Sequence, residues 1–115
     1  MKHVILGNGP TGVVAAEAIR KKRPQDEIVV VGDEHERPYS RMAIPYLLEG
    51  KIAESGTLLR HDRDHWKKLR IDLLEARAAS IDTAAKSIAL STGGTLDYDR
   101  LLLATGSRPV RPPIP

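Results

Sequence analysis

Three glycines near the start of the chain have the spacing of a turn that binds a pyrophosphate. Gly7, Gly9 and Gly12 directly follow a short apolar run. Gly7 permits a tight turn, Gly9 lets the backbone approach a phosphate, and Gly12 lets a helix pack closely on the preceding strand. Pro10 suits the first turn of that helix, where its missing N–H costs no hydrogen bond. Together with Thr11, these residues predict a helix N-terminus whose free N–H groups and dipole bind the pyrophosphate of a dinucleotide.

An acidic residue lies where the sugar of that dinucleotide is expected. Asp33 follows a second apolar run, Ile28 to Val31, and comes 21 residues after Gly12. A carboxylate at the end of the second strand can accept hydrogen bonds from an adenosine ribose. Since FAD and NAD both use such a half-site, the spacing alone leaves the dinucleotide open. A plain glycine turn between two core elements is the non-functional alternative.

The composition excludes several other chemistries. The chain has no cysteine, which excludes thiolate nucleophiles, disulfides and cysteine-ligated metals. His61 and His65 have helical spacing but no third ligand at zinc spacing, so we interpret them as solvated helix histidines. The net charge is +3, yet the chain has one Trp, three Tyr and no Phe, too few aromatics for a nucleic-acid stacking surface.

The ends and the apolar runs of the chain bear on its location. No apolar run approaches the roughly 20 residues that cross a membrane. The chain enters an apolar, strand-like stretch directly after Met1-Lys2-His3, without the pattern of a signal peptide. We therefore expect a cytoplasmic protein without a membrane partner.

The elements that must position the glycines and Asp33 alternate between strand and helix. Apolar residues at helical spacing predict a helix after Gly12, with Arg20 and Lys21 on its solvated face. Continuous apolar runs are typical of strands covered on both faces. They predict parallel strands at residues 3–6, 28–31, 71–74 and 101–104.

Two shorter helices and several small strands complete the prediction. An amphipathic helix is expected over residues 62–69, with Asp62 as its N-cap and Trp66 as its anchor on the core. A short helix interrupted by Pro45 is expected over residues 40–48. Residues 76–97 read as a small antiparallel β-meander. The predicted fold class is α/β, a parallel sheet with helices and this meander.

Two further stretches resemble a known protein family. Residues 97–109, DYDRLLLATGSRP, are similar to a segment of flavoproteins that contain two dinucleotide folds. Residues 32–47, GDEHERPYSRMAIPYL, are similar to the matching stretch of ferredoxin and rubredoxin reductases and of the nitrite reductase large subunit. On these motifs the chain resembles the N-terminal segment of the FAD-dependent pyridine nucleotide–disulfide oxidoreductases. The resemblance implies a Rossmann-like FAD-binding unit, with FAD rather than NAD as the dinucleotide.

The resemblance implies roles for residues at the pyrophosphate and ribose of FAD. The run from Gly7 to Gly12 would hold the pyrophosphate. Asp33, with Glu34 beside it, would bind the adenosine ribose. Arg41 would lie near the pyrophosphate or the flavin, and the alternative is an ordinary surface arginine.

The resemblance also implies contacts at the two ends of FAD. Ala79 corresponds to the position where this family offers backbone groups to the adenine. Ala104, Thr105 and Gly106 would pack on the cofactor as the chain leaves the sheet. For Thr105 the alternative is a small residue that serves only packing at the end of the strand.

One departure from the family limits the chemistry. Where related disulfide and peroxide reductases have a redox cysteine, this chain has Met42. A thioether cannot form a thiolate, a sulfenic acid or a mixed disulfide. The resemblance therefore implies an enzyme that passes electrons from NAD(P)H through FAD to a protein or another redox centre, not to a disulfide. We expect no catalytic acid, base or nucleophile within these residues.

The length of the chain sets its expected place in a larger protein. Complete members of the family continue into an NAD(P)-binding domain and then return to the FAD domain. We expect residues 1–107 to be the N-terminal part of an FAD-binding domain and residues 108–115 a linker towards the missing NAD(P)-binding domain. Alone, the chain is expected to be inactive. Two alternatives remain: a stand-alone NAD-binding module, and a subunit that completes the FAD site of a multi-chain dehydrogenase.

Overall fold

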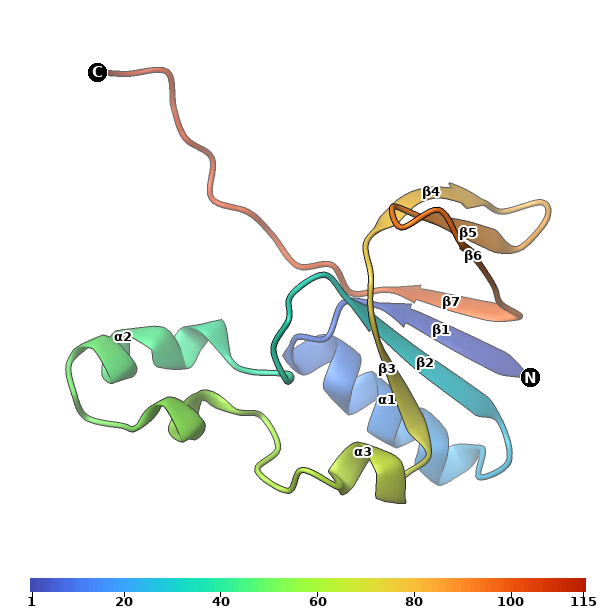
Figure 1. The fold of residues 1–115 in the computed structure, drawn as a ribbon, viewed down its shortest axis with the longest axis horizontal. Helices are drawn as coiled ribbons and strands as arrows, with labels where there is room; N and C mark the ends of the chain where they lie inside the picture. Colours follow the sequence, from blue (N-terminus) through green and yellow to red (C-terminus); the bar gives the residue numbers. More distant parts are fainter.

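A four-stranded parallel sheet forms the centre of the molecule (Figure 1). The structure is a computed structural model that describes residues 1–115. The strands follow the order β3-β2-β1-β7, and each neighbouring pair is parallel. Their bounds are Lys2–Leu6 for β1, Glu27–Gly32 for β2, Ile71–Glu75 for β3 and Arg100–Leu103 for β7. All four predicted strands are confirmed, although β7 begins and ends one residue earlier than expected.

Helix α1 (Pro10–Lys22) covers one face of this sheet (Figure 1). Its Val13 and Ala16 are buried against Ile5 of β1 and Val30 of β2. Trp66 is buried in the same cluster and is only 7% exposed, which confirms that it anchors its short helix on the core. Burying each large apolar side chain of this kind stabilises the fold by about 1.5–3 kcal/mol.

A second, antiparallel sheet packs on the opposite face. It contains β4 (Ala78–Asp82), β5 (Ser87–Leu90) and β6 (Thr95–Asp97) in the order β4-β5-β6, as predicted for the meander. Ile88 of β5 is fully buried among residues of β1 and β2 such as Val4 and Val29. Because successive side chains of a strand point to opposite faces, β1 and β2 supply both cores at once. This explains why their apolar runs are continuous.

The segment between β2 and β3 has less helix than the sequence predicts. Instead of a helix over residues 62–69, only α3 (His65–Lys68) forms. Asp62 does not cap it: its carboxylate accepts the backbone N–H of Asp64 at 2.9 Å, which holds a turn ahead of the helix. The expected interruption near Pro45 is present, since a 3₁₀ turn (Arg41–Ala43) leads into the short helix α2 (Ile44–Leu48). A further 3₁₀ turn covers Glu54–Thr57.

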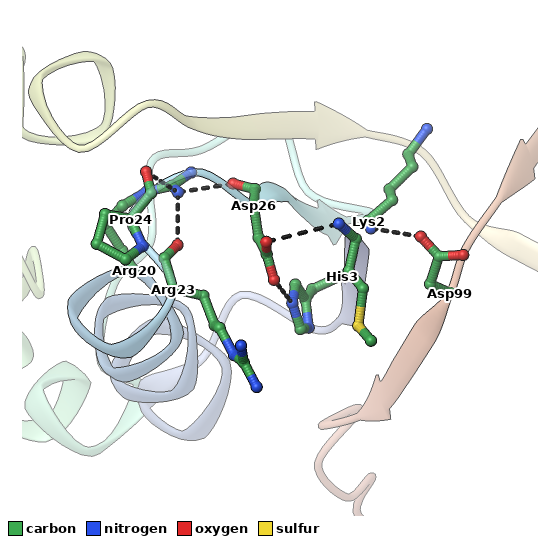
Figure 2. A network of polar contacts seen from close by, with 8 residues as sticks. Lys2, His3, Arg20, Arg23, Pro24, Asp26 and Asp99 are labelled. Atoms are coloured by element: carbon green, nitrogen blue, oxygen red, sulfur yellow. Dashed lines mark hydrogen bonds and ion pairs between the residues drawn. The ribbon is translucent and has the colours of Figure 1, made fainter.

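Arg20 does not lie on a solvated face, contrary to the sequence prediction. Its guanidinium donates to backbone carbonyl oxygens of Leu69, Arg23, Pro24, Asp26 and Arg70, at 2.6–3.1 Å. Part of this network is drawn in Figure 2. The residue is only 8% exposed, whereas the adjacent Lys21 is exposed as predicted. Helical spacing could not reveal this because the acceptors lie in the loop that follows the helix and in a segment about 50 residues away.

Beyond β7 the chain forms no further helix or strand. Residues 104–115 leave the sheet as an extended segment that runs away from the rest of the molecule (Figure 1). At the edge of the sheet, Leu103 of β7 is 61% exposed. No helix has both the length and the apolar character that a membrane crossing requires.

Candidate functional site

A large cavity lies at the carboxyl ends of the parallel strands. It has a volume of about 670 Å³. β1 has β2 on one side and β7 on the other, so the order of the strands reverses direction at β1. In open α/β sheets, ligands bind at the carboxyl end of the sheet where the strand order reverses. The lining comes from five segments, residues 6–10, 31–34, 39–42, 76–78 and 104–108.

Two of the motif glycines are required by packing inside the protein. Gly7 has φ of +114°, and a Cβ added to it would lie 2.0 Å from the carbonyl oxygen of Ala104. A Cβ on Gly12 would lie 2.0 Å from the carbonyl oxygen of Gly7. Gly7 therefore makes the tight turn, and Gly12 allows α1 to pack closely on the end of β1.

Gly9 differs, because nothing in the protein requires a glycine there. Its φ is −75°, and a Cβ added to it would have no atom within 4 Å. Gly9 and Pro10 line the cavity at the first turn of α1. The missing side chain leaves the backbone open to the cavity, as the close approach of a pyrophosphate requires.

The N-terminus of α1 offers unpaired donors to this open space. No side chain caps the helix, and its first turn contains no acidic residue. The backbone N–H groups of Thr11 and Gly12 therefore have neither an intrahelical acceptor nor a side-chain acceptor. These groups and the helix dipole favour an anion, although the atoms of Thr11 and Gly12 do not themselves line the cavity.

Asn8 and Gly32 form a contact that the sequence analysis missed. A Cβ on Gly32 would lie 2.4 Å from Nδ2 of Asn8, so the Asn8 side chain packs directly on the end of β2. Both residues line the cavity. A glycine closing the β-branched run of β2 is the signal that could have predicted this close approach.

The two predicted ribose residues have different surroundings. Asp33 is exposed, lines the cavity, and takes part in none of the ion pairs of the chain. Glu34 is engaged: Oε2 accepts the Tyr39 hydroxyl at 2.6 Å and Oε1 accepts Nη2 of Arg41 at 2.7 Å. The hydrogen bond from Tyr39, and to a smaller extent the one from Arg41, lowers the pKa of Glu34 below its usual value.

The same contacts affect the two donors. Hydrogen bonding to Glu34 raises the pKa of Tyr39 and also that of Arg41. Glu34 is therefore ionised and Arg41 charged at neutral pH. Arg41 lies at the cavity, on the 3₁₀ turn before α2.

The structure brings most, but not all, of the remaining predicted residues to the cavity. Ala104, Thr105 and Gly106 line it directly after β7, and Gly106 has φ of +71°. Ala79 does not line it: the chain reaches the cavity through Ala76, Arg77 and Ala78, and Ala79 is exposed on β4. Ala79 is therefore adjacent to this wall of the cavity, and its predicted backbone contact with the adenine stays a prediction.

The remaining candidates lie away from this cavity. No group of three or more His, Asp and Glu side chains is arranged to hold a metal ion. His61 is exposed as predicted, but it precedes α3 and is not a helix residue. His65 is not a solvated histidine, because its side chain is 23% exposed and its Nε2 lies 3.2 Å from Oε2 of Glu17. Arg60 also donates to Glu17, so this cluster ties α1 to the segment before β3.

Comparison with known proteins gives consistent results. A family model described as "Pyridine nucleotide-disulphide oxidoreductase" matches residues 1–115. An NADH oxidase of Methanocaldococcus jannaschii is 38% identical over 120 residues, which cover 99% of this chain and 27% of that protein. The ferredoxin–NAD(+) reductase subunit of a benzene 1,2-dioxygenase system from Pseudomonas putida is 31% identical, covering 90% of this chain and 25% of the relative.

A solved structure gives the same result for the fold. The reductase chain in the crystal structure of the covalent putidaredoxin reductase–putidaredoxin complex matches with a TM-score of 0.90 and 34% identity. The match covers 97% of this chain and 27% of that chain. The chain thus spans about a quarter of the length of these relatives.

Proposed function

The chain belongs to the pyridine nucleotide-disulphide oxidoreductase family, and we propose from this that its cavity binds FAD by the pyrophosphate and the adenosine. The observation that carries the proposal is Gly9, whose missing side chain serves no packing inside the protein. It lies at an uncapped helix N-terminus beside a cavity at the carboxyl ends of the strands. A pyrophosphate is the group that this arrangement fits.

The other lining segments fit the remaining parts of the adenosine end. Asp33 offers a free carboxylate to the ribose hydroxyls at the end of β2. Residues 76–78 border the same cavity and would adjoin the adenine. Thr105 and Gly106 would border the cofactor on the side of β7. In this proposal the residues bind and orient the dinucleotide, and none of them transfers a proton.

The reaction of the whole protein follows from the cofactor and the acceptor. FAD supplies the redox chemistry, because it accepts a hydride from a nicotinamide nucleotide and releases the electrons to an acceptor. Met42 lines the cavity and cannot attack or form a disulfide. We therefore infer an NAD(P)H-dependent reductase whose acceptor is a redox protein or another redox centre. Among its relatives is a ferredoxin–NAD(+) reductase subunit.

The same proposal assigns parts of the chain to the whole protein. Residues 1–107 would be the N-terminal part of the FAD-binding domain, and residues 108–115 would lead to an NAD(P)-binding domain. The extended course of residues 104–115 supports this assignment.

Replacing Gly9 tests the proposed binding site directly. In Gly9→Val, no protein atom obstructs the new Cβ, so the free energy of unfolding should change by about 1 kcal/mol or less, through a weaker helix cap. The valine side chain would keep a pyrophosphate away from the backbone. We expect the Kd for FAD, measured by quenching of flavin fluorescence, to rise about tenfold or more.

The control for this experiment is Gly94→Val. Gly94 also has open space at its Cβ position but lies in the turn between β5 and β6, away from the cavity. Its affinity for FAD should equal that of the wild type. Equal FAD affinity in both variants, or tight NADH binding without preference for FAD, would contradict the proposed function.

A further inference from the structure

Three side chains at the cavity form a connected group that we call the Glu34 clasp: Glu34, Tyr39 and Arg41. The Tyr39 hydroxyl donates to one carboxylate oxygen of Glu34, and Arg41 donates to the other. Each oxygen therefore has its own donor. All three residues line the cavity, together with Gly9 at the N-terminus of α1.

The clasp holds Arg41 without using up its donors. A guanidinium carries five N–H donors, and Arg41 gives only Nη2 to Glu34. Its side chain is 65% exposed, against 37% for Glu34, so little other than the clasp restrains it. A long side chain held in one place loses less conformational freedom when a ligand binds, which improves affinity.

Glu34 is itself held in place by Tyr39, which donates to the carboxylate oxygen that Arg41 does not use. Tyr39 is half-buried, and its backbone forms an isolated antiparallel bridge with Leu58. Its hydroxyl bond of 2.6 Å fixes the carboxylate that in turn fixes Arg41. The neighbouring Asp33 has no such partners, so a free carboxylate for a ribose is available without Glu34.

We propose that Glu34 is a positioning residue, which holds Arg41 ready to donate to the pyrophosphate of the bound dinucleotide and does not itself bind the ribose. The inference rests on the proposed function and refines it, because it separates the two adjacent acidic residues. Asp33 binds the sugar, Glu34 orients a cation, and Tyr39 orients Glu34.

The test compares three ligands on single and double variants of this chain. Glu34→Gln removes the charge that holds Arg41, and Tyr39→Phe removes only the hydroxyl that anchors Glu34. We expect Glu34→Gln to raise the Kd for FAD and for ADP about three- to tenfold, and Tyr39→Phe to raise both by a smaller factor. Adenosine has the ribose but no phosphate, so its Kd should stay unchanged in both variants.

A double-mutant cycle links the effect to Arg41. In an Arg41→Met background, Glu34→Gln should leave the Kd for FAD unchanged, because no guanidinium remains to be positioned. Glu36→Gln is the control for net charge, since Glu36 is exposed in the same loop and does not line the cavity. Circular dichroism checks that each variant is folded, and Tyr39→Phe provides a second route should Glu34→Gln not fold.

Each alternative gives a different result. Tighter FAD binding in Glu34→Gln would mean that Glu34 competes with the pyrophosphate for Arg41. An equal loss of adenosine binding would mean that Glu34 contacts the ribose. An unchanged FAD affinity, or the same loss in the Arg41→Met background, would show that Glu34 does not act through Arg41. Wild-type protein that binds neither FAD nor ADP would instead overturn the proposed function, and this inference with it.

Discussion

At the scale of single residues, Asp26 ties the N-terminus to the loop before β2 (Figure 2). Its carboxylate lies 2.8 Å from Nε2 of His3 and 3.5 Å from the α-amino group of Met1. The hydrogen bond from His3, with the charge of the α-amino group, lowers the pKa of Asp26 below its usual 3.8. An acid with a lower pKa in the folded than in the unfolded protein stabilises the fold above its unfolded pKa, and this contribution is lost as the pH falls through the folded value.

The acid dependence of unfolding should therefore change when Asp26 is replaced. In Asp26→Asn, the free energy of unfolding should be lower than in the wild type at pH 6, and the difference should shrink as the pH falls below about 4. Urea unfolding at a series of pH values measures this. Asp72→Asn, which removes an exposed carboxylate of β3 that forms no ion pair, is the control. A difference that stays constant from pH 6 to pH 2 would exclude the proposed role of the carboxylate charge.

At the scale of elements, Arg20 of α1 joins two segments that meet at the amino ends of the strands. Its acceptors lie in the loop between α1 and β2 and in the turn between α3 and β3. Arg20→Met would remove all five of these part-buried hydrogen bonds, although the carbonyl oxygens of Arg23 and Pro24 would each keep a second donor. We expect the free energy of unfolding to fall by about 2–4 kcal/mol, measured by urea unfolding.

Two matched variants separate this network from a simple change of charge. Lys21→Met removes the neighbouring exposed charge and should change stability by less than about 0.5 kcal/mol. Arg20→Lys should not restore stability, because a single ammonium cannot reproduce the guanidinium fork that reaches acceptors on both segments. Full stability in Arg20→Lys would show that charge at the C-terminus of α1, not the fork of the guanidinium, is what matters.

The elements also show what the sequence could and could not predict. The strands and the glycine turn were predictable because they depend on local patterns: continuous apolar runs, and glycines whose spacing fixes a turn. Arg20 meets two acceptors about 50 residues away, and the Glu34 clasp depends on how the loop after β2 turns back on itself. A polar residue on a helix gives the same sequence pattern whether its side chain meets water or a carbonyl oxygen. The helix over residues 62–69 was overpredicted because Asp62 stabilises a turn that competes with its first residues.

At the scale of the whole molecule, the sheet ends at β7, beside the wall of the cavity that residues 104–108 form. β7 is an edge strand, Leu103 on it is 61% exposed, and the chain beyond runs away from the sheet (Figure 1). The segment that matches this chain is only about a quarter of the length of each relative. We therefore expect that a dinucleotide held by this chain alone would leave part of its flavin in water.

Retention of FAD during purification tests this last point. We expect the isolated chain to bind FAD in a titration with a micromolar or weaker Kd, and to lose it during gel filtration, because a weak complex dissociates as free ligand is separated. The occupancy is measured on the eluted protein as the ratio of flavin absorbance, at about 450 nm, to protein absorbance, at about 280 nm. The Gly9→Val variant gives the baseline. A yellow protein peak with the wild-type chain would contradict this expectation and show that these residues alone enclose enough of the cofactor to retain it.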